Sequence, residues 1–168
     1  MLYDTTIPAS IRALTQLSAC LDKAAAFADT KKVEFPVLLN TRLIADQLPL
    51  VRQIQIACDT AKFGASRITG KDAPTNDDKE ATLAEAKARI DSTIAYLNTF
   101  KPEDFKGAEE RKVTTPRWEG KWLTGLEYAQ HHVLPNLYFH VTTAYAILRA
   151  NGVDIGKKDY LGAMPYKN

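Results

Sequence analysis

The stretch TGLEYAQHHVLPNLYFHVTTAYAILRANG, residues 124–152, decides the fold class. It predicts one long helix that runs to Ala150, because Thr124 with Glu127 has the spacing of a capping box and the Asn-Gly pair that follows is a typical helix stop. Pro135 lies inside this helix and removes one backbone hydrogen bond, so we expect a kink there. Its apolar residues recur at helical spacing and predict one buried face: Leu126, Val133, Leu137, Ala144 and Leu148.

Three further segments have apolar residues at the same steps of three and four. The first predicted helix runs from Ile7 to Asp29 and is capped by Thr5 or Thr6. The second begins between Thr41 and Gln47 and ends near Arg67, and the third begins at an Asp77–Glu80 capping box and runs to Phe100. Single helical turns are expected at residues 35–39 and 102–105.

Residues 111–115 and 118–122 are rich in threonine, valine and tryptophan and flank Pro116 and Gly120. They predict a small, irregular β-hairpin just before the last helix. Four helices that each carry one apolar face bury those faces most simply in a four-helix bundle. We therefore expect an all-α fold and a single domain over residues 1–168. The connections after the first and third helices are long enough to allow crossovers.

Composition excludes several function classes. The 168 residues include 22 basic and 20 acidic side chains, a net charge of +2, which gives no case for nucleic-acid binding. The longest purely apolar run, Ala24–Ala28, is far shorter than the roughly 20 residues that span a membrane. Residues 1–10 lack the basic start and apolar stretch of a signal peptide. These features predict a soluble cytoplasmic protein that does not bind membranes.

The candidate binding residues lie on two helices. His132, Asn136 and His140 follow one another at four-residue steps and share a face of the last helix. Asp46 and Gln53 are seven residues apart and are expected to share a face of the second helix. Because a buried amide must find hydrogen-bond partners, these five residues predict a polar interior pocket that binds a small ligand.

A metal site is the alternative to that pocket. The chain has three histidines, and no two of them are four residues apart. His132 and His140 are separated by about 12 Å along a helix axis, too far to share one ion. Hydrogen-bonded polar groups are therefore favoured over a resident cofactor. The alternative is a divalent metal such as zinc or nickel held by His140 with Asp46 and Gln53.

Other catalytic patterns are missing from the sequence. There is no GxSxG motif and no glycine-rich phosphate loop. Cys20 and Cys58 do not form a CxxC pair and are expected to be small buried thiols. Trp118 and Trp122 are expected to pack in the core, with a pocket mouth or a dimer contact as the alternative.

Two stretches carry a family resemblance. Residues 46–62, DQLPLVRQIQIACDTAK, and residues 136–162, which begin NLYFHVTTAYAILRANGV, resemble a bacterial family of uncharacterised proteins in the DinB/YfiT-like superfamily. The similarity covers nearly the whole chain. It implies a four-helix bundle, often a homodimer, in which many members hold a divalent metal through three histidines. Some of those members are thiol-dependent transferases.

The metal ligands of that superfamily are only partly present here. His140, with Leu148, Arg149 and Gly152 behind it, matches the spacing of the last-helix pattern. Asn136 stands where a second histidine is expected, and Asp46, Gln47 or Gln53 lies near the position of the third. The resemblance therefore implies the fold together with a degenerate metal site. The leading hypothesis is a bundle that binds a small ligand, and the alternative is a metal-dependent thiol transferase with a divergent site.

Overall fold

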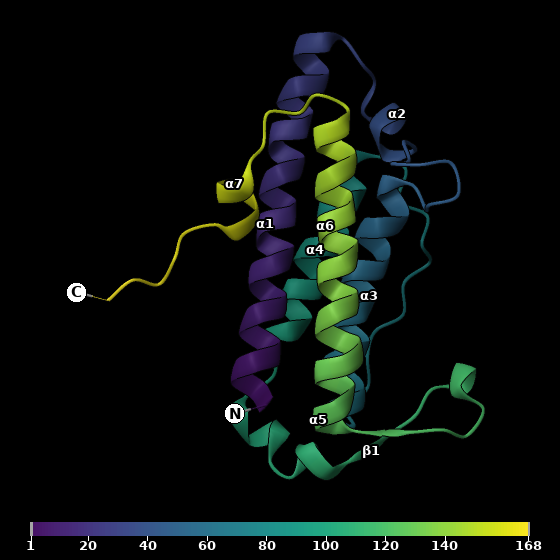
Figure 1. Ribbon diagram of the computed structural model, residues 1–168, viewed down its shortest axis with the longest axis vertical. Coiled ribbons are helices and arrows are strands. Elements are labelled where there is room, and N and C mark those ends of the chain that lie inside the picture. Colours follow the sequence, from purple (N-terminus) through teal and green to yellow (C-terminus); the bar gives the residue numbers. More distant parts are fainter. Residues whose placement is uncertain (1, 168) are drawn as a thin grey trace.

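Four long helical rods form the body of the structure, a computed structural model that describes residues 2–167 (Figure 1). Three rods are α1 (Leu2–Lys31), α3 (Leu50–Thr69) and α4 (Leu83–Leu97). The fourth rod is continuous from α5 (Gly125–Tyr128) through a π-turn (Ala129–Val133) into α6 (Leu134–Ala150). Both α1 and α3 pack against α4 and α6, so each apolar face meets two neighbours. The expected four-helix bundle is confirmed.

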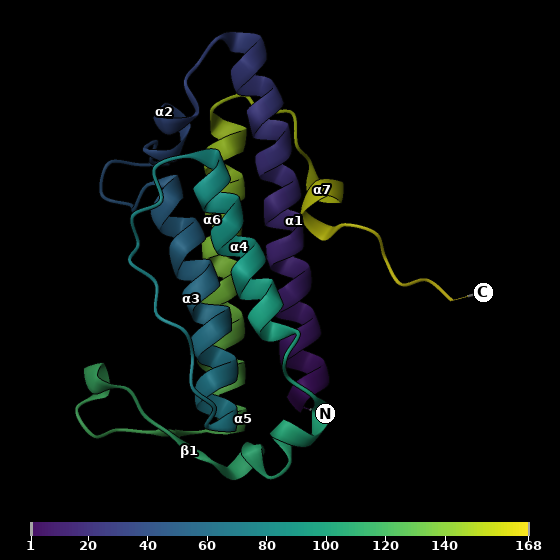
Figure 2. The same cartoon turned by 180° about the vertical axis from the view of Figure 1, so that it is seen from behind.

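The segment that joins α3 to α4, residues 70–82, is here called the strap. Figure 2 shows the strap running back along α3 to the opposite end of the bundle, so that α4 points in the same direction as α3. α1 and α6 point the other way. The order is therefore up-down-down-up, and the crossover lies in the strap rather than in either of the long connections that the sequence marked.

Smaller elements fill the connections. α2 (Phe35–Leu39) follows α1, and α7 (Lys157–Leu161) follows α6. Between α4 and α5 the chain forms three 3-10 turns and two short strands: Pro102–Phe105, Ala108–Glu110, Pro116–Trp118, β1 (Lys112–Val113) and β2 (Leu123–Thr124). The strands pair antiparallel, with Val113 opposite Leu123. The predicted hairpin is confirmed, although Trp118 lies in a turn rather than in a strand.

Tertiary packing moves the start of α1 away from the predicted cap. The helix begins at Leu2, and Thr6 does not cap it but donates its hydroxyl to the Leu2 carbonyl at 2.7 Å. Leu2 is buried, and Tyr3 packs its ring edge-on against Phe105 at 5.5 Å between centroids. These contacts extend the helix past Pro8, which therefore lies inside it and removes one backbone hydrogen bond.

Prolines and side-chain partners set the starts of α3 and α4. α3 begins at Leu50 because Pro49 is its extended N-cap and disfavours helical backbone at the residue before it. The predicted start between Thr41 and Gln47 is therefore wrong. The predicted Asp77–Glu80 box is also wrong: the capping box of α4 is Thr82 with Glu85.

The predicted ends lie closer to the observed ones, although α4 ends at Leu97, three residues before the predicted Phe100. α3 ends at Thr69, two residues beyond the prediction, with Gly70 as its left-handed C-cap at φ 79°. The Thr124–Glu127 capping box of α5 is confirmed, and the last helix ends at Ala150 as expected.

Pro135 produces a π-turn where the sequence predicted a kink. In a regular α-helix its ring would meet the carbonyl of His131. The helix widens instead just before the proline, and the Leu134 amide donates to the Ala129 carbonyl five residues back. The widened turn brings Val133 against α3 at Gly64. A Cβ built on Gly64 would lie 2.6 Å from a Val133 methyl carbon, so only glycine fits there.

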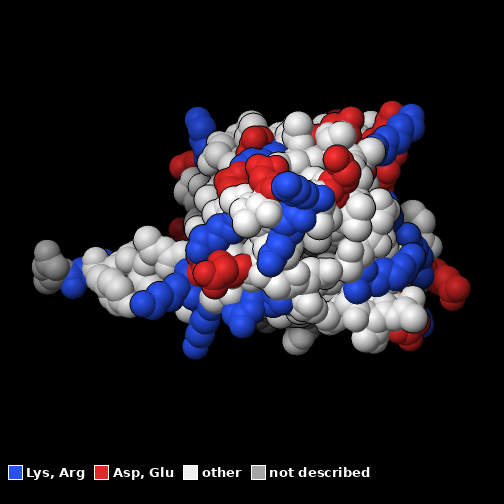
Figure 3. Space-filling view, turned by 90° about the horizontal axis from the view of Figure 1, so that it is seen from above, with Lys and Arg blue, Asp and Glu red and all other residues white. Residues whose placement is uncertain are grey.

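Charges are mixed over the surface. Seen from above in Figure 3, basic and acidic side chains are interspersed across the end of the bundle, with no single-sign face on that side. Across residues 2–167, no helix is both long enough and apolar enough to span a bilayer.

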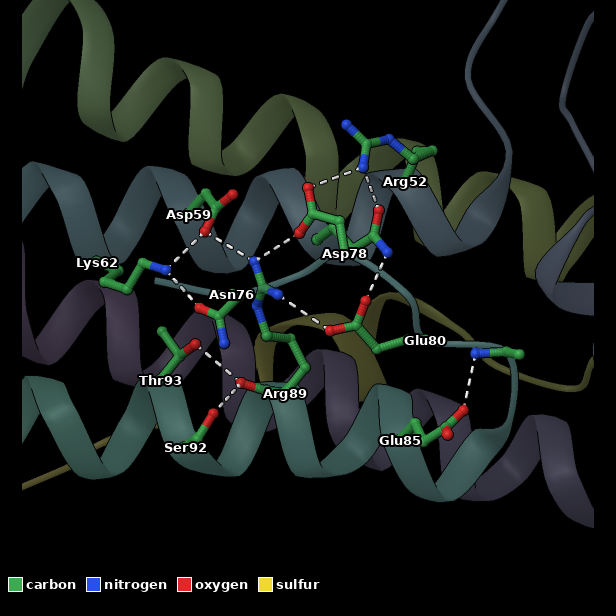
Figure 4. Close-up of polar contacts among 12 residues, drawn as sticks. Arg52, Asp59, Lys62, Asn76, Asp78, Glu80, Glu85, Arg89, Ser92 and Thr93 are labelled. Atoms are coloured by element: carbon green, nitrogen blue, oxygen red, sulfur yellow. Dashed lines mark hydrogen bonds and ion pairs between the residues drawn. The ribbon is translucent and has the colours of Figure 1, made fainter. Parts of the chain in front are cut away.

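A buried network of charges ties the strap to the bundle (Figure 4). The Arg89 guanidinium of α4, with 1% of its side chain exposed, pairs with Asp59 at 2.8 Å, Asp78 at 3.1 Å and Glu80 at 3.0 Å. Lys62, also buried, pairs with Asp59 at 2.9 Å. Three carboxylates from two segments thus surround two enclosed cations, which satisfies charges that would otherwise be costly to bury.

The network extends to further strap residues. Lys62 donates to Asn76, Gln55 donates to Glu80 at 2.6 Å, and Arg52 donates to Asp78 at 3.0 Å. Asp78 itself has a left-handed backbone at φ 55°, which ends any helical path through the strap. These contacts explain why Glu80 does not serve in a capping box.

Gly64→Ala should lower the free energy of unfolding by about 1–3 kcal/mol, because the added methyl group overpacks the contact with Val133. In a helix free of such contact the same change would raise stability by up to about 1 kcal/mol. Urea unfolding checks the sign. The double variant Gly64→Ala, Val133→Ala should recover much of the loss, and a more stable single variant would contradict the packing described here.

Arg89→Met should lower the free energy of unfolding by about 3–5 kcal/mol, because it leaves buried carboxylates without their cation. Lys79→Met is the matched control, since Lys79 pairs with Asp77 on the strap while both side chains are at least 80% exposed. Chemical denaturation of both variants is the measurement. Equal effects of the two changes would show that the buried network does not hold the strap.

Candidate functional site

The structure brings Gln53 and His140 together at the contact between α3 and α6. Their Oε1 and Nδ1 atoms lie 2.7 Å apart, and both residues are buried. Gln53 also donates its Nε2 to the Leu48 carbonyl at 2.8 Å. Because a carbonyl only accepts, the amide nitrogen must face Leu48 and the amide oxygen must face the ring. His140 therefore carries its proton on Nδ1.

The second ring nitrogen of His140, Nε2, makes no hydrogen bond to any of the described residues. Burial lowers the pKa of His140 below its ordinary value, so the ring is neutral at neutral pH. One turn away, Asn136 donates its side-chain amide to Thr60 of α3 at 2.7 Å. Two of the predicted site residues on α6 thus bind to α3 through neutral hydrogen bonds.

Asp46 does not join this group. The helix that was expected to carry it begins four residues later, at Leu50, so the seven-residue spacing to Gln53 is not a helical spacing. Asp46 lies in an exposed turn before α3. The expectation that Asp46 and Gln53 share one helix face is therefore wrong.

His132 lies in a different setting from His140. Its ring stacks on Tyr128 with an interplanar angle of 13° and a centroid distance of 5.1 Å, and the Trp118 ring meets it edge-on at 5.8 Å. Burial, with a smaller contribution from the charge of Arg67, lowers the pKa of His132. His132 is thus a neutral ring at neutral pH and belongs to an aromatic cluster.

This aromatic cluster forms one side of a cavity of about 470 Å³, here called the α3 cleft. The opposite side is a stripe of α3 residues at helical spacing: Arg52, Ile56, Asp59, Thr60, Phe63 and Arg67. Asp78 of the strap and the turn around Arg117 complete the lining. The volume falls in the range of small-molecule sites, and the lining combines aromatic rings with several charged groups, which suits a charged ligand.

The charges in the α3 cleft are unevenly paired. Arg52 is paired with Asp78, and Asp59 is paired with Arg89 and Lys62. Arg67 has no ion pair with a carboxylate among residues 2–167; it donates to the Tyr128 hydroxyl at 2.9 Å and lies 5.1 Å from the Phe63 ring centroid. Arg117 likewise has no ion pair within the described range. The end of the cleft near Arg67 therefore has an excess of positive charge.

The sequence predicted only some of the residues that line the α3 cleft. Trp118 lines it, as one of the two alternatives proposed, whereas Trp122 is half exposed with Lys112 over its ring at 5.1 Å. Arg67, Phe63 and Thr60 were not singled out. The signal that could have revealed them is the second stripe of α3, in which polar and aromatic residues recur every three or four positions opposite the apolar stripe.

The donor set does not fit the divalent metal that was considered as the alternative. Across residues 2–167, no three side chains of the histidine, cysteine, aspartate and glutamate types lie close enough together to hold an ion. The neighbour of His140 is the neutral amide of Gln53, and Asn136 is engaged with Thr60. One imidazole with neutral amides is a poor ligand set for zinc.

The two thiols do not supply a nucleophile. Both cysteines are free and buried, as expected. Burial raises the pKa of Cys20 to about 11 and that of Cys58 to about 12. Neither is a thiolate at neutral pH, and the thiolate is the reactive form.

The lowered pKa values of His132 and His140 predict how stability depends on pH. Below the ordinary histidine value of 6.5 the unfolded chain binds these protons and the folded chain resists them, so stability is full above that pH and falls as the pH drops below it. His140→Gln and His132→Gln should each flatten the decline between about pH 7 and 5. His131→Gln, at an exposed position, is the control for urea unfolding across this range. An unchanged slope in both test variants would contradict the assignment.

Comparison with known proteins agrees with this fold. A family model described as a domain of unknown function, DUF1993, matches residues 2–161. The chain is 58% identical to a DinB family member protein from Shewanella denitrificans, whose crystal structure superimposes with a TM-score of 0.97 over 100% of this chain and 96% of that one. No curated protein matches the chain. The chain thus belongs to the DUF1993 family and shares the fold of that DinB family member.

Proposed function

We propose that the protein binds a small organic anion with a flat ring in the α3 cleft. The observation that carries the proposal is Arg67, a half-buried cation with a Tyr128 hydroxyl, but no carboxylate of the described chain, as its partner. A guanidinium placed in this way binds a carboxylate or phosphate through charge-assisted hydrogen bonds. Arg117 at the cleft wall adds a second positive charge.

The aromatic cluster supports the ring of such a ligand. Trp118, Tyr128 and His132 already pack against one another, so they form a wall whose geometry needs little rearrangement. Phe63 lies one helical turn from Arg67 on the opposite side. A flat ring between these walls would gain aromatic contacts while its anionic group reaches the guanidinium.

Of the residues named from the sequence, His132 has a direct place in this proposal, because its neutral ring lines the cleft. Asn136 does not line the cleft itself, but its side-chain amide donates a hydrogen bond to Thr60, which does. Gln53 and His140 support the site by fixing α3 against α6. The proposed site thus differs from the pocket that was expected at Gln53, Asn136 and His140, because none of these three residues lines the α3 cleft.

Isothermal titration with 2-naphthoate, its neutral amide 2-naphthamide and acetate tests the proposal. The naphthoate should bind more tightly than either of the other two, which lack the charge or the ring. Arg67→Met should weaken naphthoate binding about tenfold or more, the usual value of a charge-assisted contact. Arg42→Met, an exposed arginine outside the cleft, is the control. Equal binding of naphthoate and naphthamide would overturn the proposal.

A further inference from the structure

A second cavity lies on the other side of the bundle, between α1, α6 and α7. It has a volume of about 390 Å³ and is here called the α7 pocket. Its walls are mostly apolar. The space itself arises because two alanines, one helical turn apart on α1, leave room that larger side chains would fill. The lining residues are Ala9, Ala13, Val141 and Leu161, with Tyr138, Tyr160 and Arg12 as the polar members.

Contacts to α1 and α6 hold α7 over this space. Arg12 donates to the Leu161 carbonyl from Nε at 3.0 Å and from Nη2 at 2.6 Å. Lys23 pairs with Asp159 at 2.7 Å, and the hydroxyls of Tyr160 and Thr142 lie 3.0 Å apart. The pocket is therefore built by specific polar contacts rather than left by a loose chain end.

The chain beyond α7 does not close the pocket. Met164, three residues after α7, still contacts α1, because Arg12 donates from Nη2 to its sulfur at 3.2 Å, and the chain then leads away from the bundle in Figures 1 and 2. Gly162 makes this departure possible with a left-handed backbone at φ 67°, in a position where a Cβ would lie 2.4 Å from the Gln16 side chain.

The polar groups of the α7 pocket suit an anion. Arg12 has no ion pair with a carboxylate within residues 2–167, and Asp159, the acidic residue of α7, is engaged with Lys23. The Tyr138 hydroxyl makes no hydrogen bond to a described residue. Burial and the nearby Tyr160 raise the pKa of Tyr138, against a smaller lowering by Arg12, so the phenol keeps its proton and can donate it.

We infer that the α7 pocket binds a medium-chain aliphatic monocarboxylate, with the chain against Ala9, Ala13 and Val141 and the carboxylate near Arg12 and the Tyr138 hydroxyl. The apolar walls favour an aliphatic chain, and the cation without a carboxylate favours an acid over an alcohol. This site is separate from the α3 cleft and does not depend on the function proposed there.

Titration with octanoate, 1-octanol and acetate tests the inference. Binding is monitored through the melting temperature and through the methyl signals of Ala13 and Val141 in nuclear magnetic resonance spectra. Octanoate should bind saturably, shift those signals and show contacts between its methylenes and the two methyl groups. Octanol should bind at least tenfold more weakly, and acetate should not bind detectably. The comparison of octanoate with octanol tests the role of the positive charge of Arg12. Arg12 itself is left unchanged because it also anchors α7.

Ala9→Leu fills the pocket and should weaken octanoate binding at least tenfold. Ala19→Leu places the same side chain at an exposed position of α1 and should not. Arg67→Met, in the α3 cleft, should leave octanoate binding unchanged, which separates the two proposals. Octanoate binding that survives Ala9→Leu, or octanol binding as tight as octanoate binding, would overturn the inference. If Ala9→Leu fails to fold, the inference is tested on the unaltered protein, where the absence of octanoate contacts to Ala13 and Val141 would overturn it.

Discussion

The packing of α3 against α6 is the contact on which the rest of the structure depends. Three pairs of residues define it along the antiparallel helices: Gln53 with His140, Thr60 with Asn136, and Gly64 with Val133. The first two pairs are neutral hydrogen bonds between buried or half-buried groups, which must be satisfied once they leave water. The third is a steric fit created by a π-turn, and the π-turn follows from a proline. One backbone constraint thus sets how closely the two rods approach.

This contact also determines where ligands can bind. It closes the interior between α3 and α6 with hydrogen-bonded amides, so a cavity forms beside the π-turn, where Tyr128 and His132 project toward Trp118. The strap forms another part of that cavity wall, and the buried charge network holds the strap there. Because Arg89 and Lys62 neutralise the carboxylates nearby, the positive charge of Arg67 is left for a ligand. Fold and proposed function therefore rest on the same few residues.

Sequence reasoning predicted the bundle, the hairpin and the Thr124–Glu127 cap because each has a local pattern. It misplaced the start of α1 because the packing of Leu2 and Tyr3 involves residues more than 100 positions away. It also misplaced the starts of α3 and α4, because Pro49 determines where α3 begins and the contacts of the strap determine where α4 begins. His132 and His140 were placed on one face by assuming a regular helix, but His132 lies inside the π-turn, which changes the helical register between the two. Arg67 was missed because its lack of a carboxylate partner is a property of the folded chain. The homodimer and the cytoplasmic location stay predictions.

The central claim is that neutral hydrogen bonds join α3 to α6 where the family resemblance implied a degenerate metal site. Nitrogen-15 spectra of the His140 ring, recorded before and after one equivalent of zinc is added, test it most directly. The account predicts a protonated Nδ1 and an unprotonated Nε2 in both spectra, with Gln53 as the lasting partner of Nδ1. A zinc-dependent shift of either ring nitrogen, accompanied by loss of the contact with Gln53, would contradict it.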